Sequence, residues 1–536
     1  MKMKNYIALL SVAAFLTACD IDTYPEGGAV TQDQKEDVIK QDPSKLKSDM
    51  NALKAILTEF TDNGNHLDFG YPSVCMAQDC SGQDMVSEDH GYNWLRPALL
   101  FRDRLSTSYT SNFLWSHFYG HIKSANDVLK TLYASNDESQ RVGEVADYIA
   151  QALATRAFDY MELIQAFQFT YQGHEDALGL PIVLEDITTE KAQNNPRVPV
   201  KDVYAQIMKD LDQAIAYFVA NPVKRTDKTQ INAQVAYGLR ARANMLMGRY
   251  AEAAADADKA MEGSQPYSIK EVSVPTFVDV NAASWIWGIV ITEENDVVKT
   301  GIVNWPSHMC SFTGNGYTTA TGMPVVLKRI NSELYAHMDK SDVRRGWWIN
   351  PETHDSPLLA NAWELNAGAF AGAIGFAFPD YTNMKFGPDE NEPLNPNNAQ
   401  DWPLMRTEEM ILIKAEALAR TQGVGAGKTV LENFMKQYRA PEYVCNASSV
   451  EEFVDEVWMQ RRLELWGEGF SLKDVLRLKK PIKRIGTNFS PNVTFEDIAP
   501  ESAIMIYNIP EAETNTNKGI TLDQINEVAV PPVPLN

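Results

Sequence analysis

The sequence predicts a mainly helical protein in which a scaffold of paired helices carries a loop-rich lobe with short β-strands. Two observations lead to this fold class. Apolar residues recur every three or four positions through most of residues 45–263, as on the buried face of a helix. Between residues 264 and 403, proline, glycine, asparagine and aromatic residues are frequent, and only short β-like runs such as residues 285–292 stand out.

The clearest amphipathic helix is predicted to begin near Asp202. This acidic side chain would lie in the first turn, where the helix dipole favours a negative charge. The apolar positions that follow share one face of a helix, and they are Tyr204, Ile207, Met208, Leu211, Ile215 and Phe218. Similar stripes in residues 115–132 and 145–169 predict two more long helices.

Residues 231–261 have the spacing found around the turn and second helix of a tetratricopeptide repeat. Gly248 falls at the turn, and small residues such as Ala253 allow two helices to cross closely. A generic alanine-rich hairpin is the alternative. Residues 408–420 and 429–439, with a glycine-rich turn between them, form a second candidate pair. The sequence therefore predicts degenerate tetratricopeptide-like hairpins and not a long regular array.

The first residues have the pattern of an export signal. Two early lysines precede an apolar run over residues 6–16, which is too short to span a bilayer. The run ends in Leu-Thr-Ala-Cys at residues 16–19, which resembles the lipobox of bacterial lipoproteins. An ordinary signal peptide followed by an unrelated cysteine is the alternative.

This resemblance implies that residues 1–18 are a signal peptide and that Cys19 becomes the acylated first residue of the mature protein. Residues 19–44 are polar and contain prolines and glycines, so we expect a lipidated tether. Several acyl chains hold a protein on a membrane far more firmly than one chain does. The acidic residues after Cys19 resemble those of surface lipoproteins of Bacteroidetes. The sequence thus predicts attachment to the cell outer membrane, facing the exterior.

Length and composition bound the rest of the chain. With 536 residues, of which 44% are hydrophobic and 22% charged, the chain has the composition of a folded globular protein. We predict one domain over residues 45–536, with the helical scaffold in 45–263 and 404–480, the loop-rich lobe in 264–403 and an irregular C-terminal segment in 481–536. The net charge of −23 would repel the phosphates of nucleic acid, so nucleic acid is excluded as a partner.

Four cysteines remain besides Cys19, and they lack the paired spacing of a structural zinc site. A disulfide between Cys75 and Cys80 is compatible with an exported protein, and so are buried free thiols. Cys310 and Cys445 stand alone in the sequence. The sequence predicts no chemistry at these cysteines.

Residues 423–429, Gly-Val-Gly-Ala-Gly-Lys-Thr, superficially resemble a phosphate-binding loop. Such a loop needs a glycine five residues before its second glycine, and Gln422 occupies that position. It should also follow a β-strand, whereas an alanine-rich predicted helix precedes this segment. We therefore interpret the segment as the turn of a helical hairpin.

Two other residue pairs could carry chemistry, and each has a simpler structural interpretation. His117 and His121 share a predicted helical face, yet no glutamate adjoins His117 as in a zinc-protease motif. Glu464 and Glu468 could form the carboxylate pair of a glycoside hydrolase. Two arginines just before them lie within ion-pairing reach along the helix. We predict structural salt bridges, no catalytic residues and no metal site.

Several local patterns follow one another along the chain and together resemble a known family. The most specific is Gln-Arg-Arg-Leu-Glu-Leu-Trp-Gly-Glu-Gly-Phe at residues 460–470, followed by Asp474 and Arg477. The others are residues 115–126, Leu180-Pro181 with Arg197 and Val203-Tyr204, Arg406 with Leu412 and residues 415–417, and Ile509-Pro510 with Glu513 and Asn517. This order resembles the SusD/RagB family of outer-membrane lipoproteins of Bacteroidetes. The chain departs from the family at residues 471–473, Ser-Leu-Lys, where basic and aromatic residues are common.

The resemblance implies four tetratricopeptide-like hairpins that cradle a looped lobe. It also implies capture of a nutrient at the cell surface, usually an oligo- or polysaccharide, for a partner that is a SusC-like TonB-dependent transporter. No catalysis and no obligatory cofactor follow from it, although some relatives carry a structural metal ion such as calcium. Two other functions stay open, namely a tetratricopeptide-type binder of peptides or proteins and a secreted glycoside hydrolase with an unrecognised carboxylate pair.

Aromatic residues in polar, loop-like company are the best candidates for ligand contacts, because sugar rings present apolar faces and hydroxyl edges. Tyr92, Asn93 and Trp94 follow an acidic stretch and a glycine. Trp305 and Tyr317 lie in a stretch rich in glycine, threonine and asparagine. We predict that these five residues bind ligand, with Trp94 and Trp305 as flat platforms. The tryptophans in regular patterns are predicted to be core residues, namely Trp115, Trp287 and Trp466.

Overall fold

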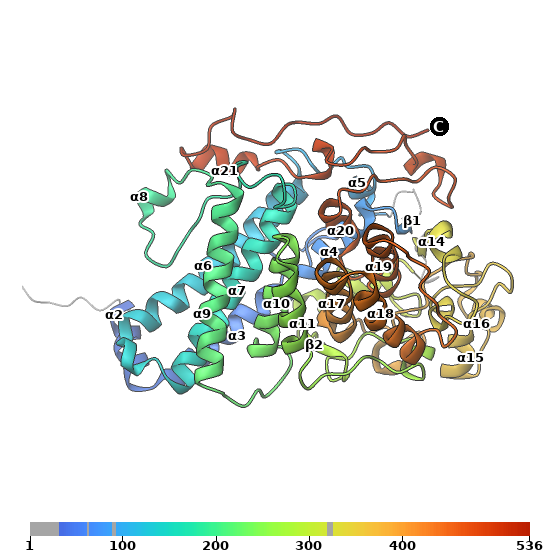
Figure 1. Ribbon diagram of the computed structural model, residues 1–536, viewed down its shortest axis with the longest axis horizontal. Helices are drawn as coiled ribbons and strands as arrows, with labels where there is room; N and C mark the ends of the chain where they lie inside the picture. The colour runs from blue at the N-terminus through green and yellow to red at the C-terminus, as the bar shows by residue number, and fades with distance from the viewer. Residues whose placement is uncertain (1–31, 62–63, 88–92, 319–324, 536) are drawn as a thin grey trace, which may run out of the picture.

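The computed structural model of the protein describes residues 32–61, 64–87, 93–318 and 325–535. Figure 1 shows long helices gathered on one side of the molecule and a lobe of loops and short helices on the other. In the described part of the chain the only sheets are two antiparallel pairs of short strands. The predicted fold class, mainly α with helical hairpins and a loop-rich lobe, is confirmed.

Three long helices form the first part of the scaffold. α6 (Tyr109–Ser135) and α7 (Gly143–Phe167) pack as a hairpin, and α9 (Val200–Ala220) packs against α7. The hydroxyl of Ser108 caps α6 by accepting a hydrogen bond from the backbone N–H of Ser111 at 3.1 Å. The apolar stripe predicted on α9 lies in the core, with Tyr204, Ile207, Leu211, Ile215 and Phe218 buried and Met208 partly buried.

Two hairpins continue the scaffold where the sequence predicted them. α10 (Ala233–Leu246) and α11 (Tyr250–Ala260) are joined by a turn in which Gly248 has a φ of +74°. α17 (Thr407–Gln422) and α18 (Val424–Tyr438) form the second hairpin, and α11 packs on α17. Segments far apart in the sequence thus stack as neighbouring hairpins.

A single glycine, Gly423, connects α17 to α18, with a φ of +91°. Lys428 lies within α18, and the segment follows a helix and not a strand. The segment thus does not form a phosphate-binding loop, and the hairpin is confirmed. Its turn is shorter than predicted, because residues 424–429 already belong to the second helix.

The N-terminal part differs from the prediction. The tether was expected to extend to residue 44, but α2 (Gln32–Gln41) is a helix that packs on α6, and α3 (Lys47–Ala55) follows it. Ile39 is buried, and Ser135 donates a hydrogen bond to the backbone carbonyl of Glu36 at 3.1 Å. These few contacts attach a polar helix whose sequence resembles a tether. The remaining tether residues, with the predicted lipid anchor Cys19, lie outside the described residues.

The loop-rich lobe is built on its two short sheets. β2 (Trp285–Ile289) pairs with β4 (Trp402–Arg406), and β1 (Met85–Ser87) pairs with β3 (Lys328–Ile330). β1 comes from the N-terminal half of the chain, so the second sheet ties that half to the lobe. The short helices of the lobe are α12 (Asp296–Lys299), α13 (Trp305–Met309), α14 (Ser332–Ala336), α15 (Pro357–Trp363) and α16 (Ala367–Ile374).

The C-terminal stretch is largely irregular and runs along one edge of the molecule (Figure 1). Arg197 holds it to the scaffold, because its guanidinium donates hydrogen bonds to the backbone carbonyl of Gln524 and to the side chain of Asn526 at 3.0 Å. The other helices of the chain are α4 (Tyr71–Ser81), α5 (Arg96–Leu99), α8 (Thr189–Ala192), α19 (Val450–Glu464), α20 (Ser471–Arg477) and α21 (Glu511–Thr516).

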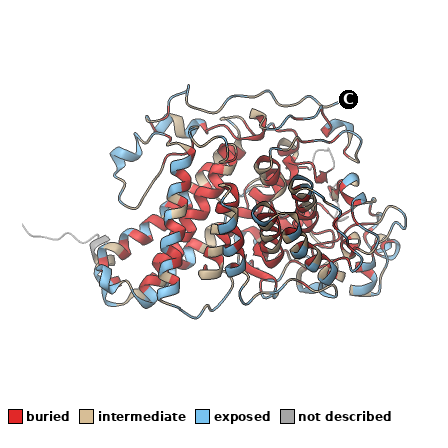
Figure 2. Cartoon of the chain, viewed as in Figure 1, coloured by how far each residue is buried: buried red, intermediate tan, exposed pale blue. Residues whose placement is uncertain are grey.

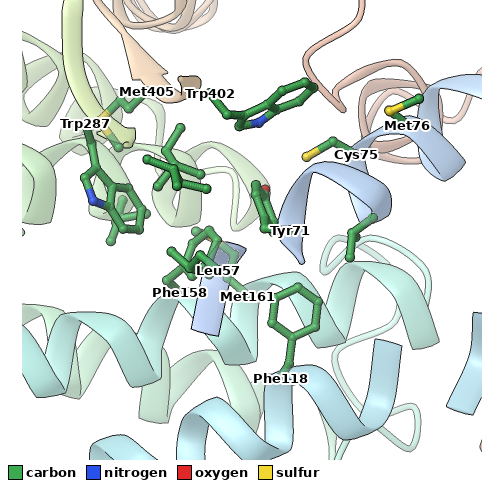
Figure 3. Close-up of a cluster of buried hydrophobic side chains, with 14 of the residues drawn as sticks. Leu57, Tyr71, Cys75, Met76, Phe118, Phe158, Met161, Trp287, Trp402 and Met405 are labelled. Atoms are coloured by element: carbon green, nitrogen blue, oxygen red, sulfur yellow. The ribbon is translucent and has the colours of Figure 1, made fainter. Parts of the chain in front are cut away.

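The main hydrophobic core continues from the scaffold into the lobe. Figure 2 shows buried residues along the inner faces of the long helices and throughout the lobe. In Figure 3, Phe158 of α7 faces Trp287 of β2, and their rings meet edge to face with centroids 5.2 Å apart. Trp115, Trp287 and Trp466 are all buried, which confirms the prediction that they are core residues. Gly238 of α10 lies so close to Met405 of β4 that a methyl group would clash with its sulfur.

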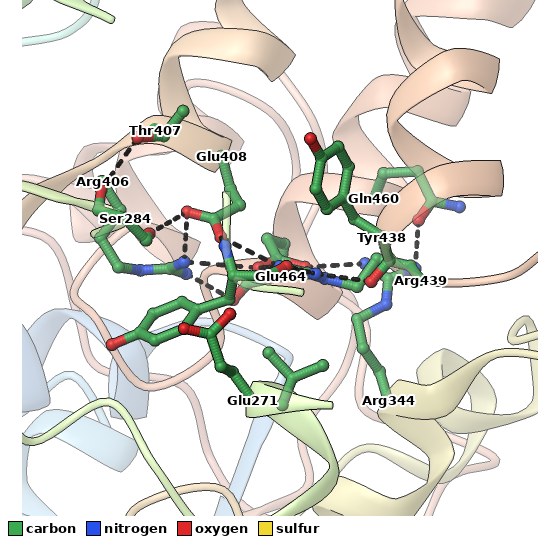
Figure 4. Close-up of polar contacts among 12 residues, drawn as sticks. Glu271, Ser284, Arg344, Arg406, Thr407, Glu408, Tyr438, Arg439, Gln460 and Glu464 are labelled. Carbon is green, nitrogen blue, oxygen red and sulfur yellow. Dashed lines mark hydrogen bonds and ion pairs between the residues drawn. The ribbon is translucent and has the colours of Figure 1, made fainter. Parts of the chain in front are cut away.

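A buried ion-pair network joins α17, α19 and the lobe (Figure 4). Glu464 accepts two hydrogen bonds from Arg439, both at 2.8 Å, and Arg344 and Arg406 lie 3.4 Å from its oxygens. Glu468 pairs with Arg406 at 2.9 Å and with the ammonium of Lys385 at 2.6 Å. All these side chains are buried. Glu464 and Glu468 therefore form structural salt bridges, as predicted. The expected partners were wrong, because Arg461 pairs with Asp474 and Arg462 with Asp84, each at 2.6 Å.

Candidate ligand site

Trp94 is the most exposed aromatic side chain among the described residues, with 42% of its surface accessible. It lies just before α5. The backbone N–H of Arg96, the first residue of α5, donates a hydrogen bond to the carbonyl of Asn93 at 3.1 Å. The side chain of Asn93 is buried and donates a hydrogen bond to Ser87 at the end of β1 at 3.1 Å. Residues 93–95 are thus fixed to both β1 and α5, and they present the indole ring of Trp94 to solvent.

The inner face of Trp94 lies on His66. The two rings are stacked, with centroids 4.8 Å apart and planes 15° apart. His66 sits in a turn in which the side chain of Asn65 accepts from the backbone N–H of Leu67 at 2.8 Å. Asp68 in the same turn accepts hydrogen bonds from the backbone of Thr61 at 2.9 Å and from the hydroxyl of Tyr109 at 2.9 Å. The turn is thus held on both sides.

Two residues of the lobe hold the edge of His66. Its Nδ1 lies 3.0 Å from Nε2 of His308, and its Nε2 lies 2.9 Å from the hydroxyl of Tyr317. His308 comes from α13, and its ring stacks on Tyr317 with centroids 5.0 Å apart. The backbone N–H of Tyr317 bonds to the carbonyl of Ser307 at 2.7 Å, a close approach that Gly316 permits because a Cβ there would meet the Ser307 backbone. Trp94 therefore rests on a connected layer of rings, the His66 layer (His66, His308 and Tyr317).

Both histidines of this layer are neutral at physiological pH. Burial lowers the pKa of His66 to about 4. Burial, with the nearby charges of Lys328 and His66, lowers the pKa of His308 well below its usual value. A neutral imidazole donates one hydrogen bond and accepts another. The hydrogen bonds that link Tyr317, His66 and His308 can thus all form with neutral side chains. The indole of Trp94 therefore rests on an uncharged support.

The structure brings together three of the five residues predicted to bind ligand, namely Asn93, Trp94 and Tyr317. Tyr317 was predicted to bind ligand, but its side chain is buried and supports the site from below. Tyr92 lies outside the described residues. His66 and His308 were missed, since neither has a neighbour in the sequence that marks it. The only signal for His308 is its place three residues after Trp305, on the same short helix.

The platform predicted at Trp305 was wrong. Its side chain is fully buried, and its indole N–H donates to the backbone carbonyl of Gln400 at 3.0 Å. Its ring packs edge to face on Phe386 and Trp402, with centroids 5.5 and 5.0 Å away. Trp305 is therefore the core anchor of α13, and it fixes the helix that carries His308.

The other candidate chemical groups serve the structure. His121 is buried between Asp159, 2.9 Å from its Nδ1, and the carbonyl of Leu53, 2.9 Å from its Nε2. His117 lies 2.9 Å from the hydroxyl of Thr61. Within the described ranges, no group of three or more histidine, cysteine, aspartate or glutamate side chains could hold a metal ion.

The cysteines and the helices add two further findings. Cys75, Cys80, Cys310 and Cys445 are buried free thiols, so the Cys75–Cys80 disulfide does not form. No helix in the described ranges has both the length and the apolar character needed to cross a bilayer.

The chain matches two family profiles. A profile described as starch-binding associating with outer membrane matches residues 38–245, and the SusD family profile matches residues 379–529. A comparison with curated proteins finds no match.

The fold is similar to solved structures of SusD proteins. A SusD-like carbohydrate binding protein from Bacteroides vulgatus ATCC 8482 is 23% identical with a TM-score of 0.72, over 91% of this chain and 98% of that chain. A SusD superfamily protein from Bacteroides thetaiotaomicron VPI-5482 is 19% identical with a TM-score of 0.70, over 93% and 100%. Surface glycan-binding protein A from Bacteroides thetaiotaomicron, in complex with laminarihexaose, is 16% identical with a TM-score of 0.62, over 90% and 99%.

The two profile matches together span more than half of the chain, and the hairpin scaffold with its looped lobe is the fold of these solved structures. The resemblance read from the sequence motifs is thereby confirmed, and the chain belongs to the SusD/RagB family.

Proposed function

We propose that this protein captures an oligo- or polysaccharide on the exposed face of Trp94 without altering it chemically. One observation carries the proposal, which is an indole that lies open to solvent while its inner face rests on the His66 layer. Sugar rings stack on flat aromatic faces, and a platform that is already rigid loses little conformational freedom when a ligand binds.

The relatives support the choice of a glycan. One family profile is described as starch-binding, and surface glycan-binding protein A is bound to laminarihexaose. The neutral layer beneath Trp94 also suits an uncharged ligand, because neither histidine carries a charge that a ligand would have to balance. The test uses several sugars that differ in sugar type and linkage.

Binding without catalysis is supported by the state of the carboxylates. Glu464 and Glu468, the pair that a glycoside hydrolase would need, are each held by buried arginines. Such carboxylates are not free to attack a glycosidic bond or to protonate it.

We further propose that the protein is held on the outer membrane by acylation of Cys19 and passes its ligand to a SusC-like TonB-dependent transporter. The lipobox at residues 16–19 and the outer-membrane description of one family profile support this placement. A Cys19→Ser variant should incorporate no labelled palmitate and should leave the membrane fraction. Co-purification of the transporter with the wild-type protein, followed by mass spectrometry, tests the partner.

The ligand-binding test uses the protein without residues 1–19 and isothermal titration calorimetry with laminarihexaose, maltohexaose, cellohexaose and xylohexaose. We expect at least one sugar to bind and Trp94→Ala to weaken that binding at least tenfold. The matched control is Trp458→Ala, which removes a half-buried tryptophan on α19. Equal affinities of wild type and Trp94→Ala would contradict the platform, and release of reducing ends would contradict capture without cleavage.

A further inference from the structure

A pair of adjoining cavities lies between the scaffold and β2, away from the His66 layer. The larger cavity has a volume of about 600 Å³ and the smaller about 290 Å³. Both are lined by Asn51 and Lys54 of α3, Gln151 of α7 and Ile231, so they form one continuous groove. Neither is lined by Trp94 or by a residue of the His66 layer. We call this pair of cavities the α3–α7 groove.

The floor of the groove is apolar. Leu53 of α3 and Trp287 and Ile289 of β2 line the larger cavity, and all three are buried in the protein. The volume of this cavity alone falls in the range of about 300–1,000 Å³ that is typical of pockets for small ligands. The three buried side chains shape the cavity and leave little of their own surface for a ligand to contact.

The wall of the larger cavity carries neutral hydrogen-bonding groups. The Asn51 amide and the Thr155 hydroxyl have no hydrogen-bond partner among the described residues, although both line the cavity. Gln151 donates one N–H to Asp147 at 2.7 Å, which leaves its carbonyl oxygen for a ligand. His121 also lines the cavity, but both its ring nitrogens are already bonded.

The charges in the larger cavity are few for so acidic a protein, whereas the smaller cavity is also lined by carboxylates such as those of Asp147 and Asp227. Among the described residues that line the larger cavity there is no aspartate and no glutamate, while the whole chain has a net charge of −23. Lys54 is the one lysine or arginine in that lining, and it makes no salt bridge with a described residue. Such a lining rejects a cation and offers little to a multiply charged anion.

From these features we infer that the α3–α7 groove holds a second glycan site in its larger cavity, which binds a neutral oligosaccharide chain through hydrogen bonds between the sugar hydroxyls and Asn51, Gln151 and Thr155. The inference rests on the proposed function for the ligand class alone, because it uses different residues. Two sites that can engage one polysaccharide raise the overall avidity without any new contact at either site.

The test blocks the groove without touching the core. Asn51 is exposed on α3, so Asn51→Trp places a large ring at the wall that both cavities share. The matched control is Ala52→Trp, because Ala52 is exposed on the same helix and lines neither cavity. Thr155→Val, which removes only a hydroxyl, serves if the tryptophan variant loses its fold by circular dichroism.

Titration calorimetry of the same four hexasaccharides reads out both sites. We expect the wild type to bind one sugar at two sites per chain, Asn51→Trp to lose one of them and Ala52→Trp to keep both. Thr155→Val should weaken the same site at least threefold, and Lys54→Met should change it less than twofold because the ligand is neutral.

The outcomes separate the two proposals. A single site that Trp94→Ala abolishes and Asn51→Trp leaves intact would overturn the second site and leave the proposed function standing. Binding that survives Trp94→Ala and is lost in Asn51→Trp supports the groove and contradicts the platform. If no hexasaccharide binds the wild type, or if only peptides bind in the groove, the inference is wrong.

Discussion

The indole of Trp94 lies flat on the imidazole of His66, with planes 15° apart, and this contact fixes the exposed ring from beneath. His66 is in turn fixed by Tyr317 and His308, residues more than 240 positions away in the chain. A surface aromatic without such support would have to be ordered by its ligand, at a cost in affinity.

We therefore predict that His66→Ala weakens glycan binding by about 2- to 10-fold, because a stacked aromatic pair contributes about 0.5–1.5 kcal/mol. Tyr317→Phe, which keeps the ring and removes the hydroxyl bonded to His66, should weaken binding less. Calorimetry with the best hexasaccharide measures both. His354→Ala is the control, since this exposed histidine pairs only with Asp380. Unchanged affinity in His66→Ala would show that the layer does not support Trp94.

Because His66 is buried as a neutral group, the free energy of unfolding should depend on pH. The pKa of His66 is about 4 in the folded protein and about 6.5 in the unfolded chain. Between these values the unfolded chain binds a proton that the folded protein does not, so stability falls as the pH decreases through this window. His66→Gln cannot titrate. From pH 7 to pH 4.5 the wild type should lose about 2–3 kcal/mol more than this variant does.

Urea unfolding at several pH values measures this difference. His337→Gln is the control, because this histidine directly follows α14 and is exposed. Parallel pH curves for wild type and His66→Gln would mean that His66 is not buried as a neutral group. If His66 is buried as a neutral group, the free energy of unfolding of the wild type minus that of His66→Gln should rise as the pH increases from 4.5 to 7.

The helical half of the fold could be predicted because its signals are local. The stripe on α9, the turn glycine Gly248 and the hairpin of α17 and α18 each lie within one short stretch of sequence. α2 was mistaken for tether because its residues are polar, and a few contacts such as that of Ile39 hold it on α6. Such contacts depend on a distant surface, which periodicity within the helix does not reveal.

The candidate site was predictable only in part for the same reason. Trp94 stands in a loop and is exposed, whereas Trp305, in a stretch of loop-like composition, begins α13 and is buried. α13 spans only five residues, too few for an apolar period that would mark Trp305 as inward-facing. His66 and His308 meet through the fold alone. Local composition indicates loops, and long-range packing decides which of their aromatics reach solvent.

The buried ion network predicts a large effect of one neutral substitution. Burial alone would raise the pKa of Glu464, but Arg439, Arg406 and Arg344 together lower it well below its usual value. Glu464→Gln would leave these buried guanidinium groups without their common carboxylate, at a cost of about 3–5 kcal/mol. The contribution of Glu464 is present above its unfolded pKa of about 4.5 and is lost as the pH falls towards the lower folded value.

Chemical denaturation at pH 7 tests this, with Asp127→Asn as the control. Asp127 pairs with Lys123 one turn away on α6, at 2.6 Å, but both side chains are exposed. Breaking such a surface pair costs about 0.3–0.5 kcal/mol. If Glu464→Gln costs no more than Asp127→Asn, the network contributes no stability to the junction of scaffold and lobe.

Three neighbouring glycines at the start of α18 should respond in different directions to alanine. Gly423 has φ +91° and ψ 163°, a region that side chains avoid, so Gly423→Ala should cost about 1–3 kcal/mol although no atom lies near the new methyl group. Gly425 is helical and open to solvent, so Gly425→Ala should stabilise the protein by about 0.5–1 kcal/mol. Gly427→Ala would press a methyl group into Phe453 and the backbone of Ala415, and should destabilise it. Thermal melting of the three variants measures these signs, and a Gly425→Ala variant that melts below wild type would mean that α18 does not begin at Val424.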